Sequence, residues 1–171
     1  AGDWVGWKTI QFCEIDSFCQ QVLRYYWPNT PLHDDIKTLK GTDVINNGQY
    51  EKHETTILVG GFPCQPYSGA GKRKGTEDDR HLWPEMLRII QEIRPEYIVG
   101  ENVYGIVNWN EGLVFDEVQT DLEAEDYEVT AVILPACAKE APHRRDRVWF
   151  VAHTSSVRTQ RLRNKHGLTS Q

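Results

Sequence analysis

The sequence predicts an α/β fold in which a mostly parallel sheet is covered by helices on both faces. Short apolar segments of strand length alternate along the chain with longer segments whose apolar residues recur at helical spacing. Such alternation is typical of parallel strands joined by helices. The 171 residues are enough for one domain with a sizeable core, and they contain no internal repeat.

Two strands and a helix are expected in the first part of the chain. Residues 9–14 form a strand that ends in acidic side chains, and residues 56–60 form a buried strand that runs into a loop rich in glycine, proline and serine. Between them, residues 18–26 form a helix that Ser17 can cap after Asp16. The apolar stripe of this helix consists of Phe18, Val22, Leu23 and Tyr26.

The second part of the chain begins with a helix over residues 82–93, which ends before Pro95. Its inner face consists of Leu82, Met86, Ile89, Ile90 and Ile93. A strand, an acidic helix and two further strands follow, at residues 97–100, 114–125, 127–134 and 148–152.

Four segments with unusual residues each follow a predicted strand, namely 14–16, 61–65, 101–103 and the residues from 135 onward. In open α/β sheets, ligands bind at the carboxyl ends of the strands. We therefore expect the four segments to meet at one edge of the sheet. Their convergence indicates a single site more strongly than any segment does alone.

Composition and charge limit the class of protein. The chain has neither a long apolar run nor a signal peptide, so a cytoplasmic location without membrane contact is expected. The net charge is −6, yet residues 154–171 carry four basic and no acidic residues. This basic tail could contact phosphates or form a solvated end. The four cysteines are scattered without a CxxC pair, so no metal site is expected.

Cys64 is the strongest candidate nucleophile. It follows Pro63 in the sequence GGFPCQPYSGAGKRKG, a polar, glycine-rich loop that holds the thiol partly exposed. Lys72, Arg73 and Lys74 could favour the thiolate, which is the reactive form. A lone cysteine is more often an ordinary buried residue, but this polar loop favours a functional one.

Two other segments carry charged groups suited to catalysis. Glu101 follows an apolar strand, and a carboxyl there can donate a proton or a hydrogen bond; a helix-capping or salt-bridged glutamate is an equal alternative. The sequence HRRDR at residues 143–147 precedes the last strand. Its arginines could orient an anionic or carbonyl group, or brace Glu101, although a solvated loop fits as well.

The order and spacing of these segments resemble a known family. The sequences GFPCQPYS at 61–68, ENV at 101–103 and RRDRV at 144–148 closely resemble the signature blocks of DNA cytosine-5 methyltransferases. So do FCEID at 12–16 and DDI at 34–36. The resemblance spans roughly residues 4–153. It implies a Rossmann-like methyltransferase core that uses S-adenosylmethionine and acts on double-stranded DNA.

The resemblance also implies a mechanism. Cys64 would add to carbon 6 of a cytosine flipped out of the duplex, so that carbon 5 can accept a methyl group. Glu101 would hold or protonate ring nitrogen 3, Arg147 would contact the base, and Arg145 would brace the catalytic loop. The implied substrate-binding residues are Phe62, Gln65, Ser68 and Asn102.

The cofactor pocket is implied in the same way, by Glu14, Ile15, Asp35, Ile36, Pro63 and Leu82. Glu14 would bind the ribose hydroxyls, and Ile15 would pack on the adenine. Asp35 would accept a hydrogen bond from the adenine amino group. From the residues alone, Asp34 and Asp35 could instead form an Asx turn.

Two blocks of the family lie outside the sequence as given. These are the first strand, with its glycine-rich cofactor loop, and the target-recognition region with the blocks after it. We therefore expect residues 1–153 to be a partial catalytic domain without its first strand, and residues 154–171 to begin the recognition region. We also expect this partial domain to have reduced activity, and we expect a complementing chain to supply the missing strand.

Two other functions stay open. A non-catalytic or split-subunit module would share the fold, although the intact Cys64, Glu101 and Arg147 argue against lost chemistry. A methyltransferase that acts on transfer RNA would share the same blocks. Competition between a DNA duplex and transfer RNA separates that reading from the first.

Overall fold

The computed structural model describes residues 6–47, 50, 55–62, 82–108, 112–139, 142–143 and 145–155. The chain divides into two compact units. The first unit comprises Ala1–Glu54 and Arg88–Arg94, and the second comprises Thr55–Leu87 and Pro95–Gln171. Helix α3 (Trp83–Ile93) therefore contributes residues to both units.

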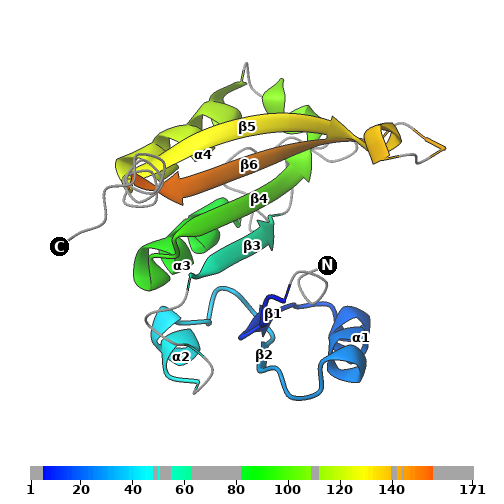
Figure 1. The fold of residues 1–171 in the computed structure, drawn as a ribbon, viewed down its shortest axis with the longest axis vertical. Helices are drawn as coiled ribbons and strands as arrows, with labels where there is room; N and C mark the ends of the chain where they lie inside the picture. The colour runs from blue at the N-terminus through cyan, green and yellow to red at the C-terminus, as the bar shows by residue number, and fades with distance from the viewer. Residues whose placement is uncertain are drawn as a thin grey trace, which may run out of the picture. The chain divides into compact units, whose positions relative to one another are not determined.

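Two short parallel strands lie at the centre of the first unit (Figure 1). Strand β1 (Phe12–Cys13) pairs with β2 (Leu32–His33). Helix α1 (Ser17–Tyr26) connects the two strands, and α2 (Gly41–Ile45) follows β2. The strand expected over residues 9–14 is present, but only two of its residues are in extended pairing.

Helix α1 begins with an aspartate cap, so the expected Ser17 cap was wrong. Asp16 is the N-cap residue, and its Oδ1 accepts a hydrogen bond from the Cys19 backbone N–H at 2.9 Å. This hydrogen bond also lowers the pKa of the Asp16 carboxyl. Aspartate and serine are equally good caps, so the sequence alone does not distinguish two adjacent candidates.

The second unit contains a four-stranded sheet in the order β3-β4-β6-β5 (Figure 1). Strands β3 and β4 are parallel, whereas β6 runs antiparallel to both β4 and β5. The strand bounds are β3 Ile57–Gly61, β4 Tyr97–Val103, β5 Tyr127–Pro135 and β6 Asp146–Thr154.

The α/β class is confirmed, but this sheet is mixed where we expected mostly parallel pairing. The connection between Pro135 and Asp146 is the reason. It is too short for the helical crossover that joins parallel neighbours, so β5 and β6 form an antiparallel pair.

The described helices of the second unit pack on one face of this sheet. Met86, near the start of α3, lies against Gly60, where an added Cβ would come within 2.9 Å of the methionine sulfur. Helix α4 (Leu113–Ala124) places the Phe115 ring 5.3 Å from the Phe150 ring. The helix expected over residues 82–93 thus has the predicted inner face, with Met86, Ile89 and Ile90 buried.

Aromatic side chains form the core between this face and the helices. Phe62 packs against Trp83 and Phe150, with ring centroids 5.2 and 6.4 Å away. Trp83 and Phe150 are each 1% exposed, and burial of such a side chain contributes about 1.5–3 kcal/mol. The Trp83 indole N–H donates to Asp121 Oδ2 at 2.7 Å, which joins α3 to α4.

The opposite face of the sheet carries exposed apolar side chains. Val59 is 66% exposed, Val132 38% and Val151 39%. We expected helices on both faces; in the part of this unit that the structure describes, the helices cover one. Among the described residues, no helix has the length and hydropathy needed to cross a membrane, and no group of three acidic, histidine or cysteine side chains is placed to hold a metal ion.

Candidate active site

Three strand ends meet at one edge of the sheet in the second unit. Gly61 at the end of β3 lies beside Glu101 of β4, and Arg147 at the start of β6 lies between Val103 and Leu134. Because β6 is antiparallel to its neighbours, it begins at the edge where β4 and β5 end. Of the four segments expected to converge, three therefore begin at this edge within this unit, and residues 14–16 belong to the other unit.

Glu101 and Arg147 form an ion pair at this edge. The Arg147 Nε lies 2.6 Å from Glu101 Oε1, and the two side chains are 22% and 35% exposed. Arg147 Nη1 also donates to its neighbour's carbonyl, Asp146 O, at 3.0 Å. A charge-assisted hydrogen bond of this kind fixes the direction of the carboxylate. Glu101 lies inside β4, which extends to Val103, and not after the strand as we expected.

Gly61 leaves room for the Glu101 carboxylate. An added Cβ at Gly61 would lie 3.3 Å from Glu101 Oε2, the oxygen that does not pair with Arg147 in this ion pair. A contact this close would require the carboxylate to move. Our sequence-based site did not include Gly61, although two successive glycines at a strand end indicate close approach of a neighbouring group.

Phe62 and Asn102, expected to bind substrate, are interior residues. Asn102 is 2% and Phe62 6% exposed. The Asn102 side-chain amide donates to Phe62 O at 3.3 Å, and its Oδ1 accepts from the Val103 backbone N–H at 2.8 Å. These contacts favour a positioning role at the end of β3 over the direct substrate contact that we expected.

Several predicted residues lie outside the described part of the chain: Pro63, Cys64, Gln65 and Ser68. Phe62 directly precedes this segment, so the Asn102 hydrogen bond holds the backbone two residues before Cys64. Arg145 is described and exposed, and its carbonyl accepts from Ala136 N–H at 3.1 Å.

The first unit contains a polar cavity of about 510 Å³ near the ends of β1 and β2. The residues that line it are Ile15, Gln20, Arg24, Leu32, His33, Asp34 and Asp35. Two of the residues expected to bind the cofactor, Ile15 and Asp35, are among them. Leu82 belongs to the second unit, where its carbonyl accepts from Met86 N–H.

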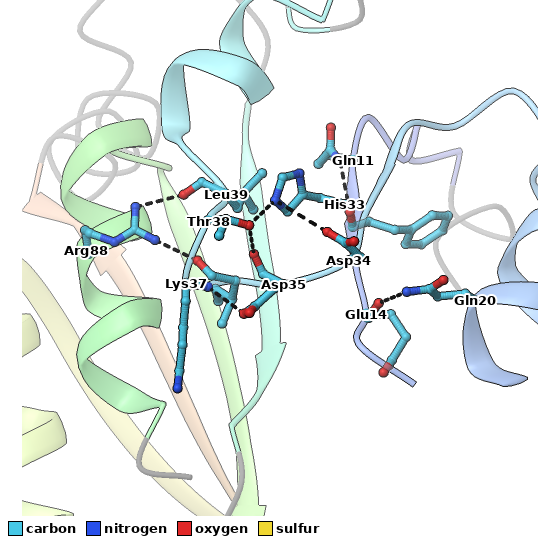
Figure 2. A network of polar contacts seen from close by, with 12 residues as sticks. Gln11, Glu14, Gln20, His33, Asp34, Asp35, Lys37, Thr38, Leu39 and Arg88 are labelled. Atoms are coloured by element: carbon cyan, nitrogen blue, oxygen red, sulfur yellow. Dashed lines mark hydrogen bonds and ion pairs between the residues drawn. The ribbon is translucent and has the colours of Figure 1, made fainter. Parts of the chain in front are cut away.

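Hydrogen bonds between side chains and backbone groups order the chain around this cavity, and Figure 2 shows those of Gln20 and Lys37. Glu14 Oε1 accepts from Asp16 N–H at 2.8 Å, and Glu14 O accepts from the Gln20 side chain at 2.7 Å. Asp35 Oδ1 accepts from Lys37 N–H at 2.9 Å. The Asx turn that we weighed as an alternative for Asp35 is therefore present, and Asp35 lines the cavity at the same time.

The surroundings of Cys13 show that this region is acidic. Partial burial of the thiol, together with the charges of Asp35, Glu14 and Asp34, raises the pKa of Cys13 to about 11. The cavity lining combines two carboxylates, Asp34 and Asp35, with Arg24 and the apolar side chains of Ile15 and Leu32, a mixture that suits the amino and ring groups of a nucleoside. S-adenosylmethionine, which carries an adenosine group and a cationic sulfonium, fits a cavity with these side chains.

Comparison with known proteins agrees with these observations. The family model for C-5 cytosine-specific DNA methylases matches residues 3–170. Type II methyltransferase M.AquIA of Picosynechococcus is 30% identical over 97% of this chain and 71% of its own length. Type II methyltransferase M1.ScrFI of Lactococcus lactis is 34% identical over 84% of this chain, which spans only 35% of that protein.

The fold is shared with solved structures. The Dnmt2 methyltransferase of S. pombe superposes with a TM-score of 0.65 over 88% of this chain and 44% of that one, at 21% identity. At this identity the likeness establishes the Rossmann-like methyltransferase fold, and the chemistry is argued from the residues at the strand edge.

Proposed function

Because this chain belongs to the C-5 cytosine-specific DNA methylase family, we propose that it transfers a methyl group from S-adenosylmethionine to carbon 5 of cytosine in double-stranded DNA. The observation that carries this proposal is the Glu101–Arg147 ion pair at the edge of the second unit's sheet. That edge also holds Gly61 and Phe62, which lead directly to Cys64.

Cys64 starts the reaction by adding its thiolate to carbon 6 of the cytosine. As the sulfur–carbon 6 bond forms, the electron pair of the carbon 5–carbon 6 double bond shifts towards carbon 5, which becomes nucleophilic. Glu101 holds ring nitrogen 3, where charge develops, and Arg147 keeps the carboxylate pointed at the base. After methylation, carbon 5 loses its proton to a base and the sulfur–carbon 6 bond breaks, which restores the double bond and the thiolate.

Six residues are proposed to hold the cofactor: Glu14, Ile15, Asp35, Ile36, Pro63 and Leu82. Support from the structure is strongest for Ile15 and Asp35, which line the polar cavity. When bound, S-adenosylmethionine supplies an electrophilic methyl group on a sulfonium sulfur. The Glu14 carboxylate accepts a hydrogen bond from the Asp16 backbone N–H, and the hydroxyl groups of a ribose are suitable further donors to it.

The DNA must present the cytosine outside the duplex, because a stacked base exposes neither face to a thiolate. Gln65 and Ser68 remain proposed contacts to that base, with Arg145 as a brace for the loop that carries Cys64. A complementing chain also remains a proposal, as does contact between the basic tail and DNA phosphates.

The test is covalent trapping. The chain is incubated with S-adenosylmethionine and a duplex that carries 5-fluorocytosine, and adducts are measured by mass spectrometry. Fluorine at carbon 5 cannot leave as a proton does, so the enzyme stays attached. We expect an adduct at Cys64 that Cys64→Ser abolishes and that Cys137→Ser, a change at an exposed cysteine in the described part of the chain, leaves intact.

Other results separate the alternatives. An adduct that forms only after a separate N-terminal segment is added indicates a split enzyme. An adduct with fluorinated transfer RNA that DNA does not compete away assigns the RNA substrate. If no adduct forms under any of these conditions, the proposal is overturned and the non-catalytic module is the remaining alternative.

A further inference from the structure

Arg88 of α3 binds the backbone of a segment some fifty residues earlier in the chain. Its Nη1 donates to Leu39 O at 2.9 Å, and its Nη2 donates to Ile36 O at 2.7 Å. Figure 2 shows the guanidinium directed at this segment from the helix. Both carbonyls are held by one planar group, a geometry that arginine provides and lysine does not.

Glu92 extends the contact to a third point. Its Oε1 accepts from Arg88 Nη1 at 2.9 Å, and its Oε2 accepts from Gly41 N–H at 2.5 Å. Gly41 is required there, because an added Cβ would lie 2.6 Å from the Glu92 Cβ. The Gly41 N–H and then Arg88 lower the pKa of the Glu92 carboxyl.

The bound segment is continuous with the turn that forms the cavity wall. Asp35 Oδ1 accepts from Lys37 N–H, and Asp35 O accepts from Leu39 N–H at 3.1 Å. Residues 35–39 are therefore held by the Asx turn on one side and by Arg88 on the other. Among these residues, Asp35 lines the cavity.

We propose that Arg88 is a positioning residue for adenine recognition: by holding the carbonyls of Ile36 and Leu39, it keeps the Asp35 carboxylate directed at the adenine amino group. The inference rests on the proposed cofactor site and extends it to a residue outside the blocks that resemble the family. Arg88 acts through Asp35 and has no contact with the reacting atoms.

The test compares two ligands that differ at the adenine amino group. S-adenosylhomocysteine carries this group, and S-inosylhomocysteine has a carbonyl oxygen in its place. Dissociation constants for both are measured by calorimetry with the full chain and with Arg88→Lys, and the melting temperature is recorded in parallel. Arg94→Lys, the same chemical change directly after the same helix, is the matched control.

We expect Arg88→Lys to weaken S-adenosylhomocysteine binding about tenfold, the size of one lost charge-assisted hydrogen bond. S-inosylhomocysteine binding should change little. The preference for the amino group, expressed as the ratio of the two dissociation constants, therefore falls towards one. Arg94→Lys should keep the preference. A general loss of stability weakens both ligands together and leaves the preference unchanged, and this result would overturn the inference.

Glu92→Gln provides a second reading if Arg88→Lys does not fold. The glutamine oxygen still accepts from Gly41, but the charge that orients Arg88 is gone, so a smaller fall in the preference is expected. An unchanged preference in this variant overturns the inference. If the wild-type chain binds neither ligand, the proposed cofactor site itself is wrong. If it binds both ligands with equal affinity, the cofactor site stands and only the proposed role of Asp35 and Arg88 is wrong.

Discussion

Glu101 and Arg147 lie diagonally across the β4–β6 ladder, on the same face of the sheet, with Arg147 Nε 2.6 Å from Glu101 Oε1. Their backbones are fixed by the ladder, and only the ends of the two side chains are free to adjust. A carboxylate and its orienting cation are thus set before any substrate arrives, which is the arrangement that favours electrostatic stabilisation of a developing charge.

Glu101→Gln should lower the methylation rate by about 10²–10⁴-fold, because an amide cannot give a proton to ring nitrogen 3. The rate is measured by transfer of a labelled methyl group to duplex DNA. Glu123→Gln, at an exposed position on α4, is the control and should keep the wild-type rate. Equal rates for the two variants would remove Glu101 from the mechanism.

Gly61→Ala should reduce trapping of the 5-fluorocytosine duplex without a comparable loss of stability. The new methyl group lies 3.3 Å from Glu101 Oε2 and displaces the carboxylate. Val59→Ala is the matched control, since Val59 is on the same strand and face but is 66% exposed. Full trapping by Gly61→Ala would show that the carboxylate position is not critical.

Phe150→Ala should destabilise the second unit by about 3–5 kcal/mol, the usual cost of deleting a buried aromatic ring. Val151→Ala, one residue later on the opposite face, should cost about 0.5 kcal/mol or less. Urea unfolding followed by fluorescence measures both. If both variants lose the same stability, the face that carries Val151 is covered in solution.

Cys13 should react slowly with iodoacetamide at neutral pH. With its pKa raised from 9.0 to about 11, the thiolate fraction at pH 8 falls about a hundredfold. Labelling rates between pH 7 and 11, read by mass spectrometry, give the pKa, and urea-unfolded protein is the control. Asp35→Asn should speed labelling, because the Asp35 charge is the largest electrostatic cause of the shift.

The same shift has a defined effect on stability. The folded-state pKa lies above the ordinary thiol value, so the contribution of Cys13 is complete below about pH 9 and is lost as the pH rises towards 11. A melting temperature that does not fall over this range more than in Cys13→Ser would contradict the assignment.

The sequence predicted most elements in their order but neither β2 nor α2, and it predicted the sheet pairing less well. Apolar periodicity identifies α3 and β4 because their inner residues are buried in a regular pattern. It does not report strand direction, which depends on the length of the connection between Pro135 and Asp146. The cap at Asp16 differs from the expected Ser17 because two adjacent residues have nearly equal capping ability.

Parts of the candidate site were also beyond sequence reasoning, for a physical reason. Glu101 and Arg147 stand out as charged residues beside apolar strands, and the structure brings them together. Gly61 and Arg88 act through a close approach and through backbone carbonyls. The paired glycines at the end of β3 are a signal for the first of these contacts, but the contacts of Arg88 depend on tertiary packing that neither residue type nor spacing indicates.

The antiparallel course of β6 also determines which changes in chain length the site tolerates. Ladder hydrogen bonds place Arg147 opposite Val103 and Leu134. Extra residues between Pro135 and Asp146 only lengthen a hairpin loop and leave this ladder unshifted. One extra residue between Arg147 and Phe150 would instead turn the guanidinium to the other face. Insertions can therefore accumulate in the loop while the strand beside it must keep its length.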